Sequence, residues 1–326
     1  MTEKTTAVQF GYTLSSEEHG PSDLVANAVA AEEAAFDFVS ISDHYHPWVG
    51  EQGHSPFVWS VLGAVAARTE RLRLAVGVTC PTIRIHPAIV AHAAATTSLL
   101  SDGRFSLGLG TGEALNEHIL GHRWPPAEVR LAMLEEAIGI LRELWTGDTV
   151  DHRGDFYEVE NARLFDPPEQ PIPVIVSGFG DKAVELAGRV GDGYWGHTPD
   201  REVVDRYRAG GGDGPRYAQI NLCWAPDAAT ARKTVHHVWP TGGIPGQLSQ
   251  DLPTWKHFEQ AAQLVTEEGA TKDVPCGPDV GPVLEATRAF VDAGYDHVYY
   301  HQVGPDQEGF LAFAERELLP RLGDLR

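Results

Sequence analysis

Short apolar runs alternate with longer amphipathic segments along almost the whole chain. The short runs are β-branched or apolar on both faces, which is typical of parallel strands covered by helices. They predict strands over residues 8–12, 36–41, 72–78, 105–109, 174–177, 193–196, 217–222 and 297–301. The segments between them predict helices, among them 21–35, 58–69, 87–100, 127–145, 182–190 and 281–293.

Eight strands in strict alternation with helices favour an α/β fold closed into a (β/α)₈ barrel, a TIM barrel, over an open sheet. Two segments depart from the repeat. Residues 147–173 predict a hairpin with a proline-rich exit, and residues 239–278, rich in glycine, proline and glutamine, predict a lid or irregular insertion. Because neither is long enough to form a second domain, we expect one barrel domain over residues 1–326.

Composition and charge disfavour several classes of partner. The chain has 25 basic and 46 acidic residues, a net charge of −21, so polyanionic nucleic acids would be repelled. No apolar run approaches the roughly 18 to 20 residues of a membrane span. Cys80, Cys223 and Cys276 lie far apart without metal-ligand spacing, and no secretory signal is visible. These features predict a reduced, cytoplasmic protein that acts on a small molecule.

Polar and titratable residues follow the predicted strands, at the end where barrel enzymes place their active sites. Asp43, His44 and Trp48 follow the second strand, and Glu113 follows the fourth. Further residues at strand ends are Cys80, Thr111, Asn116, Ser177, Gly178, Phe179, Gly180 and His197. We expect one reaction centre around Asp43, His44, Trp48 and Glu113.

Each of these residues has a structural and a functional interpretation. Histidine side chains in general change charge near neutral pH, so His44 could move a proton, or it could serve only packing. Trp48 is a wall for a planar ring, or ordinary packing. Glu113 is a buried carboxyl with a tunable pKa, or a residue favoured at a helix N-terminus. The glycine-rich turn at 177–180 could cradle a phosphate, although such turns are common.

The spacing of His44 and His46 raises the alternative of a metal-dependent barrel hydrolase. Later strand ends offer His197 and His301 but no obvious ligand aspartate, and Pro47 follows at once. We therefore expect no metal.

The residues quoted so far carry a family resemblance. The runs Ser42-Asp43-His44-(x)₃-Trp48, Gly53-His54-Ser55-Pro56-Phe57, Gly110-Thr111-Gly112-Glu113-Ala114-Leu115-Asn116-Glu117 and Ala187-Gly188-Arg189-Val190-Gly191-Asp192-Gly193 resemble the coenzyme F420-dependent glucose-6-phosphate dehydrogenase family. More broadly, the chain resembles luciferase-like barrel oxidoreductases. The similarity covers nearly the whole chain and is densest before residue 200.

The resemblance implies roles for particular residues and a deazaflavin cofactor, coenzyme F420. His44 would take the proton of the reacting hydroxyl, Glu113 would serve N1 of the deazaflavin, and Trp48 and Glu17 would stabilise or relay charge. The implied cofactor contacts are Asp43, Gly77, Val78, Cys80, Thr111, Asn116, Ser177, Gly178, Phe179 and Gly180, with a cis peptide at Gly77–Val78. Related barrels often form dimers, so a homodimer is expected.

The chain departs from the resembled family where that family grips a substrate phosphate. Asp200 stands where a lysine is expected, with Arg201 adjacent. Gln247 or Leu248 replaces a second lysine, and Asp273 replaces an arginine, with Lys272 adjacent. Carboxylates in place of cations repel a phosphate dianion. We therefore expect an unphosphorylated alcohol or sugar in an aromatic pocket that includes His54, Phe57, Trp195, His197, Trp239 and Trp255, with Arg201 and Lys272 nearby.

Several functions stay open on the sequence alone. The favoured one is hydride transfer between the carbinol carbon of the substrate and C5 of F420. The alternatives are a sugar-6-phosphate dehydrogenase, a reductase that uses the reduced deazaflavin on a carbonyl, enone or imine, an FMN-dependent luciferase-type monooxygenase, and the metal hydrolase.

Overall fold

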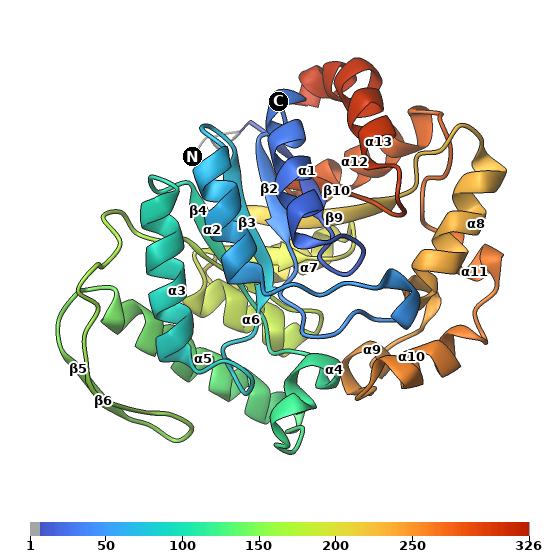
Figure 1. Ribbon diagram of the computed structural model, residues 1–326. Coiled ribbons are helices and arrows are strands. Elements are labelled where there is room, and N and C mark those ends of the chain that lie inside the picture. Colours follow the sequence, from blue (N-terminus) through green and yellow to red (C-terminus); the bar gives the residue numbers. More distant parts are fainter. Residues whose placement is uncertain (1–6, 326) are drawn as a thin grey trace.

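A closed barrel of eight parallel strands forms the centre of the computed structural model, which describes residues 7–325 (Figure 1). Around the barrel the strand order is β1-β10-β9-β8-β7-β4-β3-β2. The strands are β1 (Gln9–Leu14), β2 (Phe38–Ile41), β3 (Arg73–Thr79), β4 (Phe105–Leu109), β7 (Val174–Ser177), β8 (Gly193–Gly196), β9 (Arg216–Leu222) and β10 (His297–Gln302). All eight predicted strands, and with them the (β/α)₈ barrel, are confirmed.

Helices between the strands cover the outside of the barrel. They are α1 (Pro21–Glu33), α2 (Val58–Arg68), α3 (Pro87–Leu100), α5 (Ala127–Leu144), α6 (Asp181–Val190), α7 (Arg201–Ala209), α8 (Ala228–Val238), α12 (Gly281–Ala293) and α13 (Gln307–Phe313). In α2, Val58, Leu62 and Val65 are buried at helical spacing, so one face of the helix packs on the strands. A π turn (Ala314–Leu318) and a 3₁₀ segment (Leu319–Leu325) end the described chain.

Large side chains fill the inside of the barrel. A buried cluster is formed by Phe38, Ala75, Ile175, Trp195, Tyr217 and Tyr299, and Val78 packs against it. The indole Nε1 of Trp195 donates a hydrogen bond to the hydroxyl of Tyr299 at 2.7 Å. The barrel interior is therefore filled below its mouth, and the ends of the strands are where a barrel enzyme is expected to bind its ligand.

Both departures from the repeat lie outside the barrel. The segment between α5 and β7 forms the predicted hairpin, with β5 (Val150–Arg153) antiparallel to β6 (Glu158–Ala162). The segment after α8 contains four short helices rather than irregular chain: η3 (Pro240–Gly243), α9 (Leu248–Asp251), α10 (Trp255–Ala262) and α11 (Glu267–Thr271).

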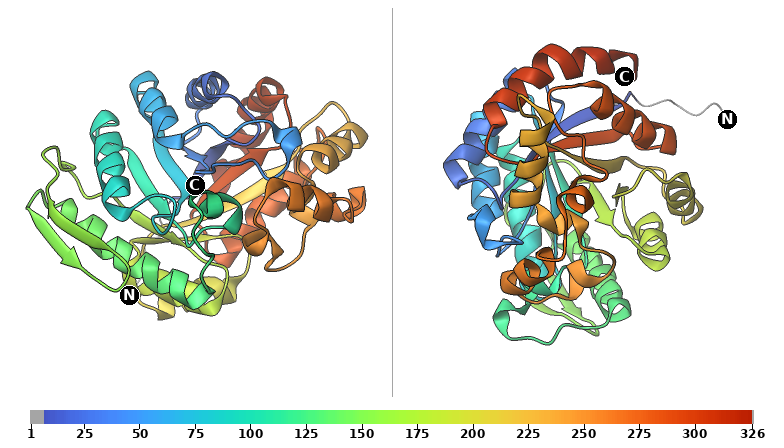
Figure 2. Two further views of the ribbon diagram at one scale, coloured as in Figure 1. Left: turned by 60° about the horizontal axis from the view of Figure 1, so that its bottom comes forward. Right: turned by 90° about the vertical axis from the view of Figure 1, so that its right-hand side faces the viewer.

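The C-terminal ends of the strands carry the short helices η1 (Gly50–Gln52), α4 (Ala114–Glu117) and η2 (His118–Leu120). Figure 1 shows α4, α9 and α10 gathered on the side away from both termini, and the left view of Figure 2 brings this side forward. The insertion packs here, with α9 against α4 and α10 against η1. Among residues 7–325, no helix combines the length and apolar character needed to cross a bilayer.

Candidate active site

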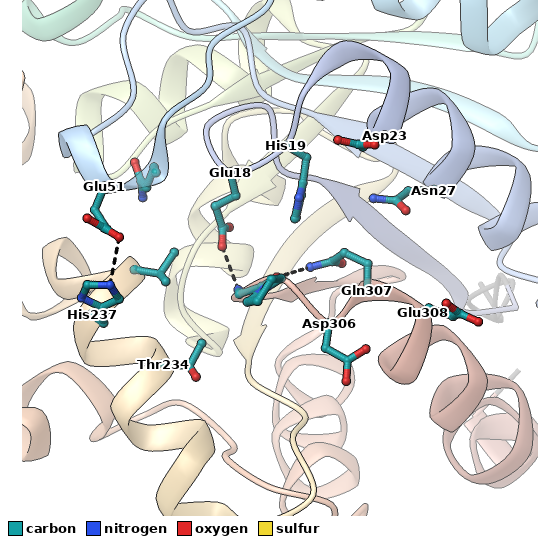
Figure 3. Close-up of a pocket in the computed structure, with 14 residues that line it drawn as sticks. Glu18, His19, Asp23, Asn27, Glu51, Thr234, His237, Asp306, Gln307 and Glu308 are labelled. Carbon is teal, nitrogen blue, oxygen red and sulfur yellow. Dashed lines mark hydrogen bonds and ion pairs between the residues drawn. The ribbon is translucent and has the colours of Figure 1, made fainter.

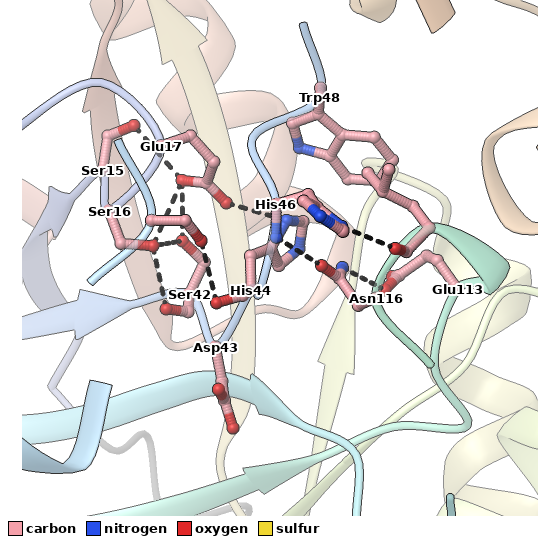
Figure 4. Close-up of polar contacts among 12 residues, drawn as sticks. Ser15, Ser16, Glu17, Ser42, Asp43, His44, His46, Trp48, Glu113 and Asn116 are labelled. Atoms are coloured by element: carbon pink, nitrogen blue, oxygen red, sulfur yellow. Dashed lines mark hydrogen bonds and ion pairs between the residues drawn. The ribbon is translucent and has the colours of Figure 1, made fainter. Parts of the chain in front are cut away.

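A carboxylate and an imidazole meet at the mouth of the barrel, where β1 and β2 end (Figure 4). Oε1 of Glu17 lies 3.2 Å from Nδ1 of His44, and the two side chains are 3% and 10% exposed. The other oxygen of Glu17 accepts a hydrogen bond from the hydroxyl of Ser42 at 2.8 Å. Glu17 is therefore held in place from one side and faces the imidazole with its other side.

The loop that carries His44 is fixed by side chains from two neighbouring segments. The amide oxygen of Asn116 accepts hydrogen bonds from the backbone N–H groups of Tyr45 and His46, at 2.9 and 3.2 Å. The side-chain oxygen of Gln52 accepts a hydrogen bond from the backbone N–H of Trp48 at 2.8 Å. Asn116 thus anchors this loop from α4, and its predicted contact with a cofactor stays a prediction.

Trp48 stands over the histidine. Its ring is edge-on to that of His44, with centroids 5.0 Å apart, and edge-on to Phe258 of α10, with centroids 5.1 Å apart. Trp48 also belongs to a small apolar cluster with residues of the insertion, including Ile244, Leu252 and Trp255. The insertion therefore supports the aromatic wall of the site.

His46, which raised the metal alternative, is turned away from His44. Its Nδ1 lies 3.2 Å from the carbonyl oxygen of Leu115, and its ring stacks on that of His118. Within residues 7–325, no group of three or more histidine, cysteine or acidic side chains is arranged to hold a metal ion.

Arg84, Asp43 and Glu117 form an ion cluster beneath the loop that carries His44. The sequence analysis missed this cluster. Arg84, which follows β3, bonds to Oδ1 of Asp43 at 2.9 Å and to the Asp43 carbonyl at 3.0 Å. The backbone N–H of Arg84 donates to Glu117 at 2.7 Å, and the hydroxyl of Thr79 donates to Oδ2 of Asp43 at 2.6 Å. Arg84 thereby ties together the ends of β2, β3 and β4, which carry the candidate catalytic groups.

The charges of this cluster do not balance. Burial raises the pKa of Glu117 to about 7, although Arg84 pulls it down. Burial also raises the pKa of the Cys80 thiol well above its usual range, with a contribution from Glu113 and Glu117. Cys80 is therefore a neutral thiol near pH 7, and Glu117 exchanges a proton there.

A cleft of about 820 Å³ opens at the barrel mouth, and Glu113 is among the residues that line it. One wall has Val78 and the turn Gly110–Glu113, and another has Ser177, Gly178, Phe179 and Gly180. Seven of the residues predicted for the cofactor or catalysis line this single space: Val78, Thr111, Glu113, Ser177, Gly178, Phe179 and Gly180. The remaining walls come from α5, α6 and the segment around α9. Gln247 of that segment was expected near a substrate phosphate, whereas the helices α5 and α6 had not been assigned to the site.

The floor of the cleft is built for close approach of the backbone. The Gly77–Val78 peptide is cis, as the resemblance implied. A Cβ on Gly77 would lie 2.5 Å from the Trp195 ring, and one on Gly110 would lie 2.8 Å from Cγ2 of Val78. Glycine is thus required at both positions, and the surface beside Val78 stays open to a flat ligand.

A second cavity, of about 700 Å³, lies on the other side of the loop after β1 (Figure 3). Its acidic lining comprises Glu18, Asp23, Glu51, Asp306 and Glu308. Glu18 is engaged by Nε2 of the buried His301 at 2.6 Å and by the N–H of Gly304 at 2.8 Å. Such a lining repels anions, so a ligand that carries phosphate would favour the cleft beside Val78.

The residues predicted for the substrate pocket do not all reach the site. Trp195 is 1% exposed and lies in the barrel interior beneath Gly77, not on the surface of an open pocket. His54 is exposed, with its ring near Gly20. His197 bonds to Ser177 and stacks on Phe179, with ring centroids 4.0 Å apart, so it borders the cleft.

The two predicted cations are also remote from the cleft. The exposed Arg201 donates to the carbonyl of Asp292, and the exposed Lys272 ends α11. Neither lines the cleft beside Val78. Asp200, which stands where a lysine was expected, accepts the N–H of Glu202 at 2.8 Å and caps α7. A helix cap thus occupies the position of the missing cation.

The sequence matches a known protein family over most of its length. The family model described as Luciferase-like monooxygenase matches residues 5–297. The chain belongs to the luciferase-like monooxygenase family. This family assignment confirms the resemblance expected from the sequence.

Curated relatives narrow the assignment within the luciferase-like family. The chain is 36% identical over 331 residues to the F420-dependent glucose-6-phosphate dehydrogenase of Microbacterium testaceum, covering 98% of each chain. It is 35% identical over 329 residues to the enzyme of that name from Amycolatopsis mediterranei, covering 97% of this chain and 98% of the relative. The expected oxidoreductase class is thereby confirmed.

Solved structures of luciferase-like barrels agree with the fold. An F420-dependent secondary alcohol dehydrogenase, in complex with an F420–acetone adduct, superposes with a TM-score of 0.89 at 28% identity and covers 97% of this chain and 99% of its own. The coenzyme F420-dependent tetrahydromethanopterin reductase of Methanopyrus kandleri superposes with a TM-score of 0.78 at 20% identity, covering 97% and 99%, and supports the fold alone.

Proposed function

We propose that the protein is an F420-dependent oxidoreductase that transfers a hydride between the carbinol carbon of an unphosphorylated alcohol or sugar and C5 of the deazaflavin. The observation that carries the proposal is the buried Glu17–His44 pair beside Trp48, at a barrel mouth that also holds Glu113. The names of the curated relatives and of the alcohol dehydrogenase structure support the cofactor.

The cleft fits a flat cofactor with a phosphate-bearing side chain. Val78, the glycines at 110 and 112, Glu113 and the turn at 177–180 all line this cleft. When bound, the deazaflavin supplies a carbon that accepts or returns a hydride. Glu113, the N-cap residue of α4, would exchange a proton with the ring.

His44 would take the proton of the substrate hydroxyl. Because Nδ1 faces Glu17, Nε2 is the ring nitrogen left to act on a substrate. The carboxylate orients the ring and stabilises the imidazolium that forms, as in other acid–base pairs of histidine and carboxylate. Trp48 shields the pair and gives a small alcohol an apolar wall.

The charges around the site favour an uncharged substrate. Positive side chains at hydrogen-bonding distance give the strongest recognition of a phosphate. Of the cations adjacent to the expected phosphate positions, Arg201 donates to the carbonyl of Asp292 and Lys272 does not line the cleft, while Asp200 caps a helix. An aromatic, neutral surface near Trp48 instead suits a primary or secondary alcohol or a free sugar.

A panel of substrates tests the proposal. Purified protein with F420 is given alcohols, free sugars and sugar 6-phosphates, and loss of the cofactor absorbance is followed without oxygen. We expect kcat/KM for the best unphosphorylated substrate to exceed that for glucose 6-phosphate by at least about tenfold, the cost of losing one good ionic contact. A clear preference for glucose 6-phosphate would instead support the sugar-phosphate dehydrogenase named in the relatives.

The reverse reaction and the assembly are tested separately. Reduced F420 with ketones, enones and imines shows whether the enzyme acts as a reductase. Light scattering of the purified protein tests the homodimer, which stays a prediction.

A further inference from the structure

One arginine in the cofactor cleft is buried and makes no ion pair with the carboxylates of the described residues. Arg130, in the first turns of α5, is 2% exposed and lines the cleft. Its guanidinium donates to the carbonyl of Pro125 at 2.6 Å and to the amide oxygen of Gln250 at 3.2 Å, and it stacks over Trp124. Its buried Nε has no hydrogen-bond partner.

The other charged residues of α5 and α6 in the cleft are already paired. Lys182 bonds to Glu128, and Asp181 bonds to Arg206. No carboxylate among residues 7–325 lies within ion-pairing distance of Arg130. Asp251 and Glu113 act on its charge only from beyond that distance. A buried charge without a direct ion pair is costly, and a bound ligand of opposite charge would offset that cost.

We propose that Arg130 is an anion subsite of the cleft and binds the phosphate on the side chain of the cofactor. The inference rests on the proposed function and adds a residue that recognises the cofactor away from its reacting ring. Arginine suits the task because its planar fork matches the oxygens of a phosphate.

The surroundings of Arg130 are consistent with an anion site. Gln250 presents a neutral oxygen to the guanidinium. A phosphate oxygen would replace this oxygen or bind beside it. Gln250 belongs to α9, and its neighbour Asp251 accepts the indole N–H of Trp124 at 3.1 Å. The glycine-rich turn before α6 also lines the cleft, and no side chain caps that helix at Gly180. The unsatisfied N–H groups of a helix start attract anions, so both features favour phosphate.

The affinities of the wild type and of Arg130 variants for two ligands test the subsite. Calorimetry compares intact F420 with its deazaflavin chromophore that lacks the phosphate-bearing side chain, on the wild type and on Arg130→Gln. We expect the substitution to weaken F420 binding by about tenfold to a hundredfold and chromophore binding by less than about twofold. Arg130→Lys, which keeps the charge and loses the fork, should give a smaller loss for F420 alone.

Arg142→Gln is the matched control, because Arg142 lies on the same helix, is exposed, and pairs with Asp192. It should change neither affinity. Equal losses for both ligands in Arg130→Gln and Arg130→Lys would show a purely structural role and overturn the subsite. Unchanged F420 affinity in both variants would overturn it too. A wild type that binds neither ligand would refute the proposed function itself.

Discussion

Replacing Glu117 with glutamine should stabilise the protein at pH 8 and change its stability little near pH 5. Glu117 is 1% exposed, and its pKa is raised by burial from 4.5 to about 7. The folded chain therefore holds this proton more tightly than the unfolded chain does. The stability from this group is complete below pH 4.5 and is lost as the pH rises through 7.

The magnitude follows from the size of the shift. A pKa that rises from 4.5 to about 7 corresponds to about 3 kcal/mol of lost stability above pH 7. Glutamine is neutral at every pH and keeps an oxygen that accepts the N–H of Arg84, while Arg84 keeps its contacts with Asp43. The variant should therefore gain up to about 3 kcal/mol over the wild type at pH 8.

Urea unfolding followed by tryptophan fluorescence at pH 5 and pH 8 measures this difference, and the chain has eight tryptophans. Glu143, on α5, is exposed, so Glu143→Gln serves as the control. We expect it to alter the free energy of unfolding by the same small amount at both pH values. The reasoning is refuted if Glu117→Gln and the wild type differ by the same amount at both pH values, or if the variant is less stable at pH 8.

Three further predictions concern catalysis and packing. His44→Gln should lower kcat by about a hundredfold to ten-thousandfold, as expected for loss of a general base, while calorimetry shows unchanged F420 affinity. Gly77→Ala should lower the free energy of unfolding by about 1 to 3 kcal/mol, because the new methyl would lie 2.5 Å from the Trp195 ring. Gly139→Ala, where the methyl meets no atom within 4 Å on an exposed part of α5, should instead raise it by about 1 kcal/mol. Melting curves of these two glycine variants would contradict the packing account if their shifts had the same sign.

The barrel was predictable because its signal is local. Short apolar strands alternate with amphipathic helices, and parallel strands in that order close into a barrel with their C-terminal ends together. That rule alone brought His44, Trp48 and Glu113 to one end, and the structure places them there.

The orientation of buried side chains was not predictable in the same way. Barrel strands are apolar on both faces, so the sequence does not show which residues point inward. Trp195 was expected in a substrate pocket, yet its position on β8 directs it into the interior. The insertion was read as irregular because helices of four to eight residues are too short to show a period.

The ion cluster and the anion subsite depend on contacts between distant segments. Arg84 follows the third strand among acidic strand ends, which was the available signal, but its contacts with Asp43 and Glu117 span 41 and 33 residues. Arg130 looks like an ordinary helix residue until α9 covers it through Gln250, 120 residues further along the chain.

The most direct test of the account is the transfer of the carbinol hydrogen itself. The protein is incubated without oxygen with F420 and a secondary alcohol deuterated at the carbinol carbon, and the reduced cofactor is examined by mass spectrometry. The account predicts loss of F420 absorbance and one deuterium in the reduced deazaflavin. In His44→Gln, both the loss of absorbance and the transfer of deuterium should be slower by about a hundredfold or more. An enzyme that ignores F420 but consumes oxygen with reduced FMN would contradict it.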